Sequence, residues 1–362
     1  MFCFITASTK ESCMKEIKIG LVGCGAVAPT HINSYKQIPG ATVKTICDLK
    51  RDKAAAMAAK LGVPNFTENF TDMLNDPEID LIDICTDHAS HSPLAVAAMD
   101  AGKNVVCEKC LSNTLEGLDA MLAAHKKHPE LVFSGIFQHR HEKGNLLLKK
   151  LLDRGCFGQL LNASVYLCCL RPDSYYSDYW HGKWNGEGGS VLITQVVHFI
   201  DLVNYFLGTP ESVIAKCDNM AHQGVIETED NAAALVRYPG GVFATICGTS
   251  ASAVDTGFNA TVIIGGTKGH IELAAFRPVY WRFHDKAAEE EVAELMKNYH
   301  EETPPDPEKP HYGGAHPAQL ADVIDAVRNH REPYVTVEKA AVTARLILNC
   351  YRSSQTGGWI NI

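Results

Sequence analysis

The feature that most restricts the fold of this chain is a glycine turn between a strand-like run and a helix-like run. Residues 17–22 are apolar and β-rich, and the helix-like segment 27–38 begins only a few residues later. The turn matches the G-x-G-x-x-G/A pattern, in which glycine lets the backbone approach a pyrophosphate at a helix N-terminus. The motif predicts a dinucleotide-binding βαβ unit, although a purely structural turn fits the same letters. The turn residues expected at the cofactor are Gly23, Gly25, Ala26, Val27 and Ala28.

An acidic residue in the right place supports the dinucleotide interpretation. Asp48 follows the second β-rich run, 41–47, and stands 20 residues beyond Ala28. A carboxylate at this distance from the turn can accept hydrogen bonds from the ribose hydroxyls of the adenosine. It would also repel a 2′-phosphate, so the sequence favours NAD. Lys50 and Arg51 lie close by and keep NADP as the alternative.

The first third of the chain alternates strand-like and helix-like segments, which is typical of a parallel, doubly wound sheet. The strand-like runs are 17–22, 41–47, 81–85, 104–107 and 131–137, with a weak run near Asn65. The helix-like segments between them are 27–38, 51–61, 89–101 and 115–127.

The pattern then changes to consecutive strands separated only by turns, which predicts an antiparallel sheet. These strand-like runs are 160–170, 212–216, 232–238, 242–249, 259–264, 270–273 and 279–283. Helices are predicted at 143–152, 189–207, 317–329 and 337–353. We therefore predict an N-terminal extension at 1–15, a Rossmann domain at 16–138, and an α+β domain at 139–362 with an open, mostly antiparallel sheet.

Composition excludes several classes of protein. The 362 residues are enough for two domains, and 46% of them are apolar, which fits a globular chain. A net charge of −9 has the wrong sign for binding phosphate backbones, so no nucleic-acid partner is expected. No apolar run is long enough to cross a membrane. Thirteen cysteines, several within apolar runs, suggest reduced thiols and the cytoplasm.

Several motifs together resemble the glucose-fructose oxidoreductase, inositol dehydrogenase and rhizopine catabolism family (Gfo/Idh/MocA). They are Gly23-x-Gly25-x-x-Ala28-x-x-His31, Thr86-Asp87-His88-Ala89-Ser90-His91, the run 101–109 ending in Glu108-Lys109, and Gly188-Gly189-Ser190 leading to His198-x-x-Asp201. The resemblance covers nearly the whole chain from residue 16. It implies NAD(P) at the junction of the two domains, with a sugar or cyclitol between the nicotinamide and the second sheet.

The resemblance implies that Lys109 and His198 are the catalytic residues. Lys109 stands in the family's Glu-Lys-Pro signature, but Cys110 replaces the proline, so we expect a trans peptide bond there. Thr194, His198 and Asp201 should share one helix face. Many relatives have an aspartate where this chain has Thr194, and threonine is no base near neutral pH. His198 is therefore expected to take the hydroxyl proton, with a pKa near the usual value of about 6.5.

The same mapping, with the polar and aromatic residues around the expected cleft, completes the predicted site. Further cofactor contacts are expected from Thr86, His88, His91, Glu108, Lys109 and Gln138. Substrate contacts are expected from Lys109, Arg171, Tyr176, Trp184, Thr194, Gln195, His198 and His316. A solvated lysine at a strand end and a packed histidine are the alternatives for the catalytic pair. No metal is expected: Cys107 and Cys110 form a C-x-x-C without a second pair at chelating spacing.

These observations predict an NAD-dependent dehydrogenase that acts on a secondary hydroxyl of a sugar, a glycoside (possibly at C3) or a cyclitol. A glycosidase that oxidises C3 transiently and then eliminates the aglycone is one alternative. A non-catalytic NAD-binding sensor or repressor is another. Relatives pair through the second sheet, so the resemblance also implies a homo-oligomer, a dimer or tetramer.

Overall fold

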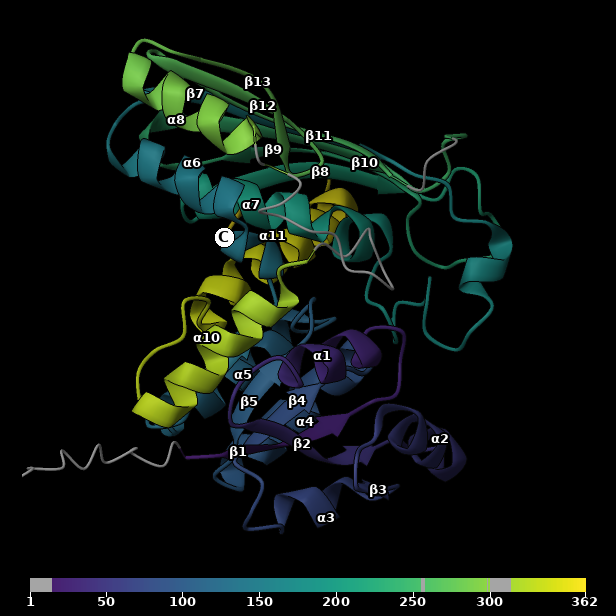
Figure 1. Ribbon diagram of the computed structural model, residues 1–362. Helices are drawn as coiled ribbons and strands as arrows, with labels where there is room; N and C mark the ends of the chain where they lie inside the picture. Colours follow the sequence, from purple (N-terminus) through teal and green to yellow (C-terminus); the bar gives the residue numbers. More distant parts are fainter. Residues whose placement is uncertain (1–14, 255–257, 298, 300–313) are drawn as a thin grey trace, which may run out of the picture.

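The computed structural model describes residues 15–254, 258–297, 299 and 314–362, and these fold into two layered domains (Figure 1). Strands from residues 17–135 make one sheet, and strands from residues 160–361 make the other. Apart from Lys15, the predicted N-terminal extension lies outside the described residues. The predicted fold class, a Rossmann domain followed by an α+β domain, is confirmed.

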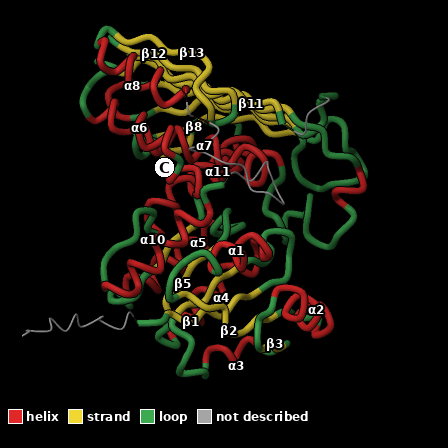
Figure 2. The backbone as a smooth tube through the Cα atoms, in the orientation of Figure 1, coloured by secondary structure: helices red, strands yellow, loops and turns green. Residues whose placement is uncertain are grey.

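The first sheet has six parallel strands in the order β3-β2-β1-β4-β5-β6 (Figure 2). This is the doubly wound order, which reverses direction between β1 and β4 and leaves a crevice there at the carboxyl ends of the strands. The strands are β1 Ile17–Val22, β2 Ala41–Cys47, β3 Asn65–Thr67, β4 Leu81–Ile84, β5 Asn104–Cys107 and β6 Phe133–Gly135. Ile19, Leu81 and Val105 are completely buried, as expected for strands covered on both faces.

Helices cover this sheet, and one of them comes from far along the chain. The helices that follow its strands are α1 Ala28–Tyr35, α2 Arg51–Leu61, α3 Phe70–Leu74, α4 His88–Asp100 and α5 Leu115–Lys127. Helix α10, His316–Asn329, packs against α1 (Figure 1). Leu320, Val323 and Ile324 of α10 are fully buried in the same core as β1. A segment predicted for the second domain therefore completes the first.

The second sheet has eight strands in the order β13-β12-β11-β7-β10-β9-β8-β14. All its described pairs are antiparallel except β7 with β10, so the prediction of a mostly antiparallel sheet is confirmed. The strands are β7 Leu160–Cys168, β8 Ser212–Asp218, β9 Asn231–Arg237, β10 Phe243–Thr249, β11 Asn259–Gly266, β12 Gly269–Ala274, β13 Arg277–Phe283 and β14 Ile360–Asn361.

Of the two faces of this second sheet, only one is covered by the helices that the structure describes (Figure 1). Burial alternates along β10, where Ala244 and Ile246 are buried while Phe243 and Thr245 are exposed. The remaining helices are α6 Lys143–Asp153, α7 Val197–Leu207, α8 Lys286–Lys297 and α11 Val337–Thr356. No helix within the described ranges combines the length and apolarity that crossing a membrane requires.

The predicted helix at 189–207 is broken into two parts. A π-helical turn, η3, spans Val191–Val196 and passes directly into α7. The predicted alignment is correct for Thr194 and His198, which line one cavity, and wrong for Asp201, which does not. Asp201 turns away and forms a buried ion pair with Arg140 (2.7 Å). A sequence pattern with a period of 3.6 residues does not reveal such a turn.

Candidate active site

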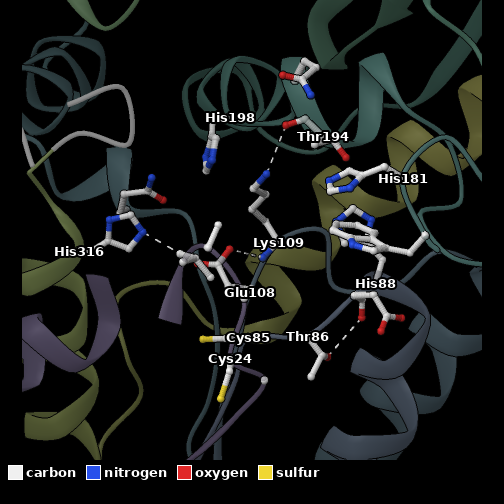
Figure 3. Close-up of a pocket in the computed structure, with 18 of the residues that line it drawn as sticks. Cys24, Cys85, Thr86, His88, Glu108, Lys109, His181, Thr194, His198 and His316 are labelled. Carbon is white, nitrogen blue, oxygen red and sulfur yellow. Dashed lines mark hydrogen bonds and ion pairs between the residues drawn. The ribbon is translucent and has the colours of Figure 1, made fainter. Parts of the chain in front are cut away.

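A cavity of about 1690 Å³ runs from the glycine turn of the Rossmann domain to the helix α7 of the second domain. Most of the predicted site residues line it, and Figure 3 shows how several of them converge. The lining includes Gly23, Gly25, Ala26, Val27, Asp48, Thr86, His88, Glu108, Lys109, Gln138, Arg171, Thr194, Gln195, His198 and His316. Ala28, His91, Tyr176 and Trp184 are not part of this lining.

The glycine turn has the shape that a dinucleotide requires. Gly23 has a φ of +95°, and a Cβ there would lie 2.5 Å from the carbonyl oxygen of Cys85, so a larger residue does not fit. At Gly25 the atom nearest to a Cβ would be that same oxygen, 3.5 Å away, so the protein itself leaves room for a side chain there. The second glycine instead keeps the cavity side of the turn open for close approach by a ligand.

Asp48 lies beside this turn at the end of β2. Its Oδ2 accepts a hydrogen bond from the backbone N–H of Cys24 (2.9 Å), and its Oδ1 accepts one from that of Lys50 (2.9 Å). The ammonium of Lys53 is 3.7 Å away. The carboxylate is thus fixed at the cavity wall with lone pairs left for a diol, as NAD binding requires.

A buried chain of charges fixes the loop that carries Lys109. His31 Nδ1 lies 2.8 Å from Asp83 Oδ2, and its Nε2 lies 3.0 Å from Glu108 Oε1. Burial alone would lower the pKa of His31, but the charge of Asp83 raises it well above its usual value. Burial likewise raises the pKa of Glu108, but the hydrogen bond and charge of His31 bring it down to about 2. His31 is therefore an imidazolium between two carboxylates.

This ion cluster also accounts for the two sets of potential metal ligands among the described residues. Both sets contain His31, one with Glu108 and His316, the other with Asp83 and Cys85. A protonated imidazole has no lone pair for a metal ion. The groups are held together by their own charges.

The peptide bond between Lys109 and Cys110 is cis, so the prediction of a trans bond is wrong. Cys110 is completely buried. Its N–H donates to His88 Nε2 (3.4 Å), and its carbonyl oxygen accepts from His91 Nδ1 (2.8 Å). His91 thus lies behind the lining, where its hydrogen bond to Cys110 holds the loop in place.

Lys109 reaches from this loop to the second domain. Its Nζ donates to the carbonyl oxygen of Thr194 (3.2 Å), as Figure 3 shows. Burial lowers the pKa of Lys109 below its ordinary value, and the negative charges of Glu108 and Glu187 oppose that shift. The ammonium is therefore held at the point where the two domains face each other across the cavity.

His198 faces the same space from α7 (Figure 3). Its Nδ1 is buried and has no hydrogen-bond partner among the residues that the structure describes, and its ring packs edge-on against His139, with the centroids 4.9 Å apart. Burial, followed by the positive charges of His139 and Lys109, lowers its pKa well below the usual value. The prediction that His198 titrates near 6.5 is therefore wrong, and this imidazole is neutral near pH 7.

The hydroxyl of Thr194 contacts the carboxylate of Glu187, a residue that the sequence analysis did not predict for the site. This hydroxyl donates to Glu187 Oε1, and Glu187 Oε2 accepts from the backbone N–H of Gly182 (2.6 Å). Glu187 is completely buried. Burial raises its pKa to about 8, against the lowering effect of its hydrogen bonds. The only hint in the sequence is an acidic residue immediately before Gly188-Gly189.

The cavity lining also offers polar and aromatic groups suited to a polyhydroxylated ligand. Arg171 Nη2 and Nε donate to Gln195 Oε1 (2.7 and 3.1 Å), and Gln195 Nε2 donates to the hydroxyl of Tyr175 (3.2 Å). His316 Nε2 lies 3.9 Å from Glu108 Oε1. Tyr175 also lines the cavity, whereas its neighbour Tyr176, which the sequence analysis predicted there, does not.

Two of the predicted substrate residues are turned away from this cavity. The hydroxyl of Tyr176 shares a hydrogen bond with that of Ser250 (3.1 Å), and the side chain is 4% exposed. The indole N–H of Trp184 donates to the carbonyl oxygen of Glu227 (3.0 Å). Trp184 lies in a separate hollow of about 220 Å³ beside Tyr351. Composition marked this loop as aromatic, but it could not give the direction of each ring.

Comparison with known proteins places this geometry among sugar and cyclitol oxidoreductases. The chain is 26% identical to myo-inositol 2-dehydrogenase of Thermotoga maritima over 70% of its length and 74% of that protein. It is 29% identical to levoglucosan dehydrogenase of Pseudarthrobacter phenanthrenivorans, over 56% of this chain and 54% of that protein.

A solved structure and two family models also match this chain. The WlbA dehydrogenase of Bordetella pertussis, solved with NADH and UDP-GlcNAcA, has a TM-score of 0.84, covers 96% of this chain and 98% of its own, and is 26% identical. A model described as "Oxidoreductase family, NAD-binding Rossmann fold" matches residues 17–136, and one described as "Oxidoreductase family, C-terminal alpha/beta domain" matches residues 149–362. The chain therefore belongs to the Gfo/Idh/MocA oxidoreductase family, with an NAD-binding Rossmann domain at its start.

Proposed function

We propose that this protein oxidises a secondary hydroxyl of a sugar, glycoside or cyclitol with NAD, or catalyses the reverse reduction. The observation that carries this proposal is that Lys109, Thr194 and His198 converge on the same cavity as the glycine turn and Asp48. Relatives that act on inositol and levoglucosan support the substrate class. In this arrangement a hydroxyl-bearing ligand meets an ammonium and a neutral imidazole beside the cofactor site.

NAD fits the residues of the Rossmann domain. The open side of Gly25 and the N-terminus of α1 can take the pyrophosphate, and Asp48 can take the ribose. When bound, NAD supplies the nicotinamide carbon that accepts a hydride. The protein supplies orientation and charge, and both are fixed in advance by buried contacts.

Lys109 and His198 have distinct tasks in this proposal. The Lys109 ammonium is anchored to Thr194 and points into the cavity, where it donates a hydrogen bond to the reacting oxygen and stabilises negative charge as it develops. His198 is neutral and can accept a hydrogen bond from a neighbouring hydroxyl of the substrate, which orients the ring. Arg171 and Gln195 can bind the other hydroxyls of the ring.

A direct test offers NAD with myo-inositol, levoglucosan or UDP-GlcNAcA and follows NADH absorbance together with the mass of the product. We expect NADH and a ketone in equal amounts with one of these probes. Lys109→Met is the matched control, because it keeps the aliphatic stem and removes the charge. Release of free sugar without net NADH would instead support a glycosidase. NAD binding without turnover of any probe would support a sensor.

We also propose that the uncovered face of the eight-stranded sheet joins copies of this chain into a dimer or tetramer. Tyr166, Phe243 and Tyr280 point outward from three of its strands and are 47, 43 and 52% exposed. Large exposed apolar side chains on a flat sheet favour association. Light scattering should give an oligomer for the wild-type chain and a smaller species for Phe243→Glu. A monomeric wild-type chain would contradict this proposal.

A further inference from the structure

We propose that Glu187 is the proton store of this site, and that it takes up the proton of the substrate hydroxyl through the side chain of Thr194. This inference rests on the proposed function, because it concerns the proton that a hydroxyl loses during oxidation. Glu187 touches neither the cavity nor a ligand in it, so it is a positioning residue that acts through Thr194. Thr194 lines the cavity, and the carboxylate of Glu187, from the preceding loop, lies behind it.

The contacts define a short path from the cavity to Glu187. Thr194 lines the cavity, and its hydroxyl donates to Glu187 Oε1. The carbonyl oxygen of the same residue accepts from Lys109 Nζ (3.2 Å). A group that binds Lys109 therefore lies next to the one hydroxyl that leads to Glu187. The other carboxylate oxygen is occupied by Gly182 N–H (2.6 Å), which fixes the direction of the side chain.

The other two polar groups at the reaction centre are poor places to leave a proton. His198 would become a cation beside Lys109 and His139, in a site that is already buried, and these groups lower its pKa well below the usual value. Lys109 is needed in its protonated form to stabilise the oxygen. A carboxylate, whose charge the proton removes, is the better acceptor in such a buried site.

Glu187 is such a group. It becomes neutral on protonation, and it forms no ion pair with any of the described residues, in contrast to Glu108. Burial raises its pKa to about 8, so uptake and release both occur near neutral pH. The titratable groups that act on it are Lys109, Glu229, Tyr175, Tyr176 and Tyr351. Of these, Glu229 raises its pKa and Lys109 lowers it.

The transfer balances in protons and electrons. The substrate O–H bond breaks and its proton forms a bond to Thr194 Oγ1, while the original Thr194 proton moves to Glu187 Oε1. The substrate carbon loses its hydrogen with both electrons to bound NAD⁺, so the alcohol is oxidised to a ketone and the cofactor is reduced. Thr194 ends as a hydroxyl and Glu187 as a carboxylic acid. The Glu187 proton then returns by the same path in the reverse reaction, or passes to solvent through the open cavity.

The first experiment needs no sugar. Infrared difference spectra of the full chain, recorded against pH, report the C=O stretch of a protonated carboxyl. We expect a band that titrates near pH 8 and is missing in Glu187→Gln. In Thr194→Val the band should remain and titrate at a higher pH, because the hydroxyl no longer stabilises the carboxylate. Thr194→Ser, which keeps the hydroxyl, should behave like the wild-type chain.

Glu229→Gln is the matched control for loss of a buried carboxylate. Glu229 accepts hydrogen bonds from the backbone N–H groups of Ser190 and Leu192 and from the Tyr351 hydroxyl, with no contact to Thr194. In Glu229→Gln the infrared band of Glu187, which Thr194→Val shifts, should remain. Absence of a Glu187 band above pH 6, or a band that Thr194→Val does not move, would overturn the proposal.

The second experiment measures NADH formation against pH with myo-inositol, levoglucosan and UDP-GlcNAcA as probes. With a probe that reacts, Glu187→Gln and Thr194→Val should each lower turnover about 10²-fold, abolish the rise near pH 8 and leave NAD affinity unchanged, and the double variant should be no slower. An unchanged pH profile in Glu187→Gln would overturn the proposal. Failure of the wild-type chain with all three probes would count against the proposed function, while the infrared titration still decides the present inference.

Discussion

Two buried glutamates on either side of Lys109 have the same chemistry and opposite behaviour. Glu108, on the Rossmann side, faces the imidazolium of His31 at 3.0 Å, and its pKa falls to about 2. Glu187, on the α7 side, has hydrogen bonds but no paired cation among the described residues, and its pKa rises to about 8. The presence of one cation therefore decides whether a buried carboxylate is a fixed charge or a titrating group. The first suits a scaffold, and the second suits proton transfer.

Removing the cation beside Glu108 should have the largest effect. His31→Leu leaves Asp83 and Glu108 buried without a positive partner, so we expect a loss of about 3–5 kcal/mol in the free energy of unfolding at pH 7. Denaturant titration measures this loss. Lys53→Leu, which removes an exposed cation 3.7 Å from Asp48, is the control and should cost far less. Equal losses would mean that the His31 cluster is not an ion network.

Removing the titrating carboxyl should change how stability depends on pH. The folded-state pKa of Glu187 is raised, so its contribution to stability is complete below the ordinary carboxyl pKa and is lost as the pH rises towards about 8. Relative to the wild-type chain, the free energy of unfolding of Glu187→Gln should therefore rise by up to ~1.4 kcal/mol per pH unit over that interval. Paired denaturant titrations between pH 5 and 9 measure the difference. A constant difference would show that Glu187 stays ionised.

Glu108 gives the matched comparison with the opposite sign. Its folded-state pKa is lowered, so its contribution is complete above the ordinary carboxyl pKa and is lost only as the pH falls towards about 2. The stability difference between the wild-type chain and Glu108→Gln should therefore stay level from pH 5 to 9. A slope there would mean that the two glutamates do not differ as described.

Changing the residue between the two glutamates should affect catalysis more than folding. Lys109→Met keeps the stem and removes the charge that we propose stabilises the reacting oxygen, so turnover should fall about 10²-fold or more, while NAD affinity and melting temperature change little. Single-turnover rates, NAD titration and thermal melting on one preparation separate these effects. Near-normal turnover, or a loss explained by unfolding, would contradict the assigned role.

The smallest effect is expected at the far end of the cavity. Asp48→Ala removes the ribose acceptor and the charge that repels a 2′-phosphate, so NAD affinity should fall about tenfold more than NADP affinity. Titration of both cofactors gives the ratio. Parallel losses would place Asp48 away from the ribose and leave the choice of cofactor open.

The parts of the molecule that depend on local sequence were predictable. The Gly23 turn and Asp48 follow from spacing along one βαβ unit, where strand, turn and helix are neighbours in the chain. The positions of Lys109 and His198 on the cavity came from resemblance to a family, since no local pattern distinguishes them from a solvated lysine and a packed histidine.

The parts that depend on distant contacts were not predictable. Thr194, whose hydroxyl donates to Glu187, lies in a π turn, and a sequence period of 3.6 residues does not reveal that turn. The loop after Lys109 is held by His88 and His91, which hydrogen-bond to Cys110 from about 20 residues earlier. Tyr176 and Trp184 lie in the expected loop, but their partners, Ser250 and Tyr351, lie far along the chain.

Isotope transfer tests the central claim of hydride transfer most directly. The protein is incubated with NAD and with myo-inositol or levoglucosan deuterated at the ring carbons, and the masses of NADH and of the sugar product are measured. The account predicts NADH that carries one deuterium, formed in equal amount with a ketone, and much less of both from Lys109→Met. NADH without deuterium, or sugar products formed with no NADH, would contradict direct hydride transfer from a sugar carbon.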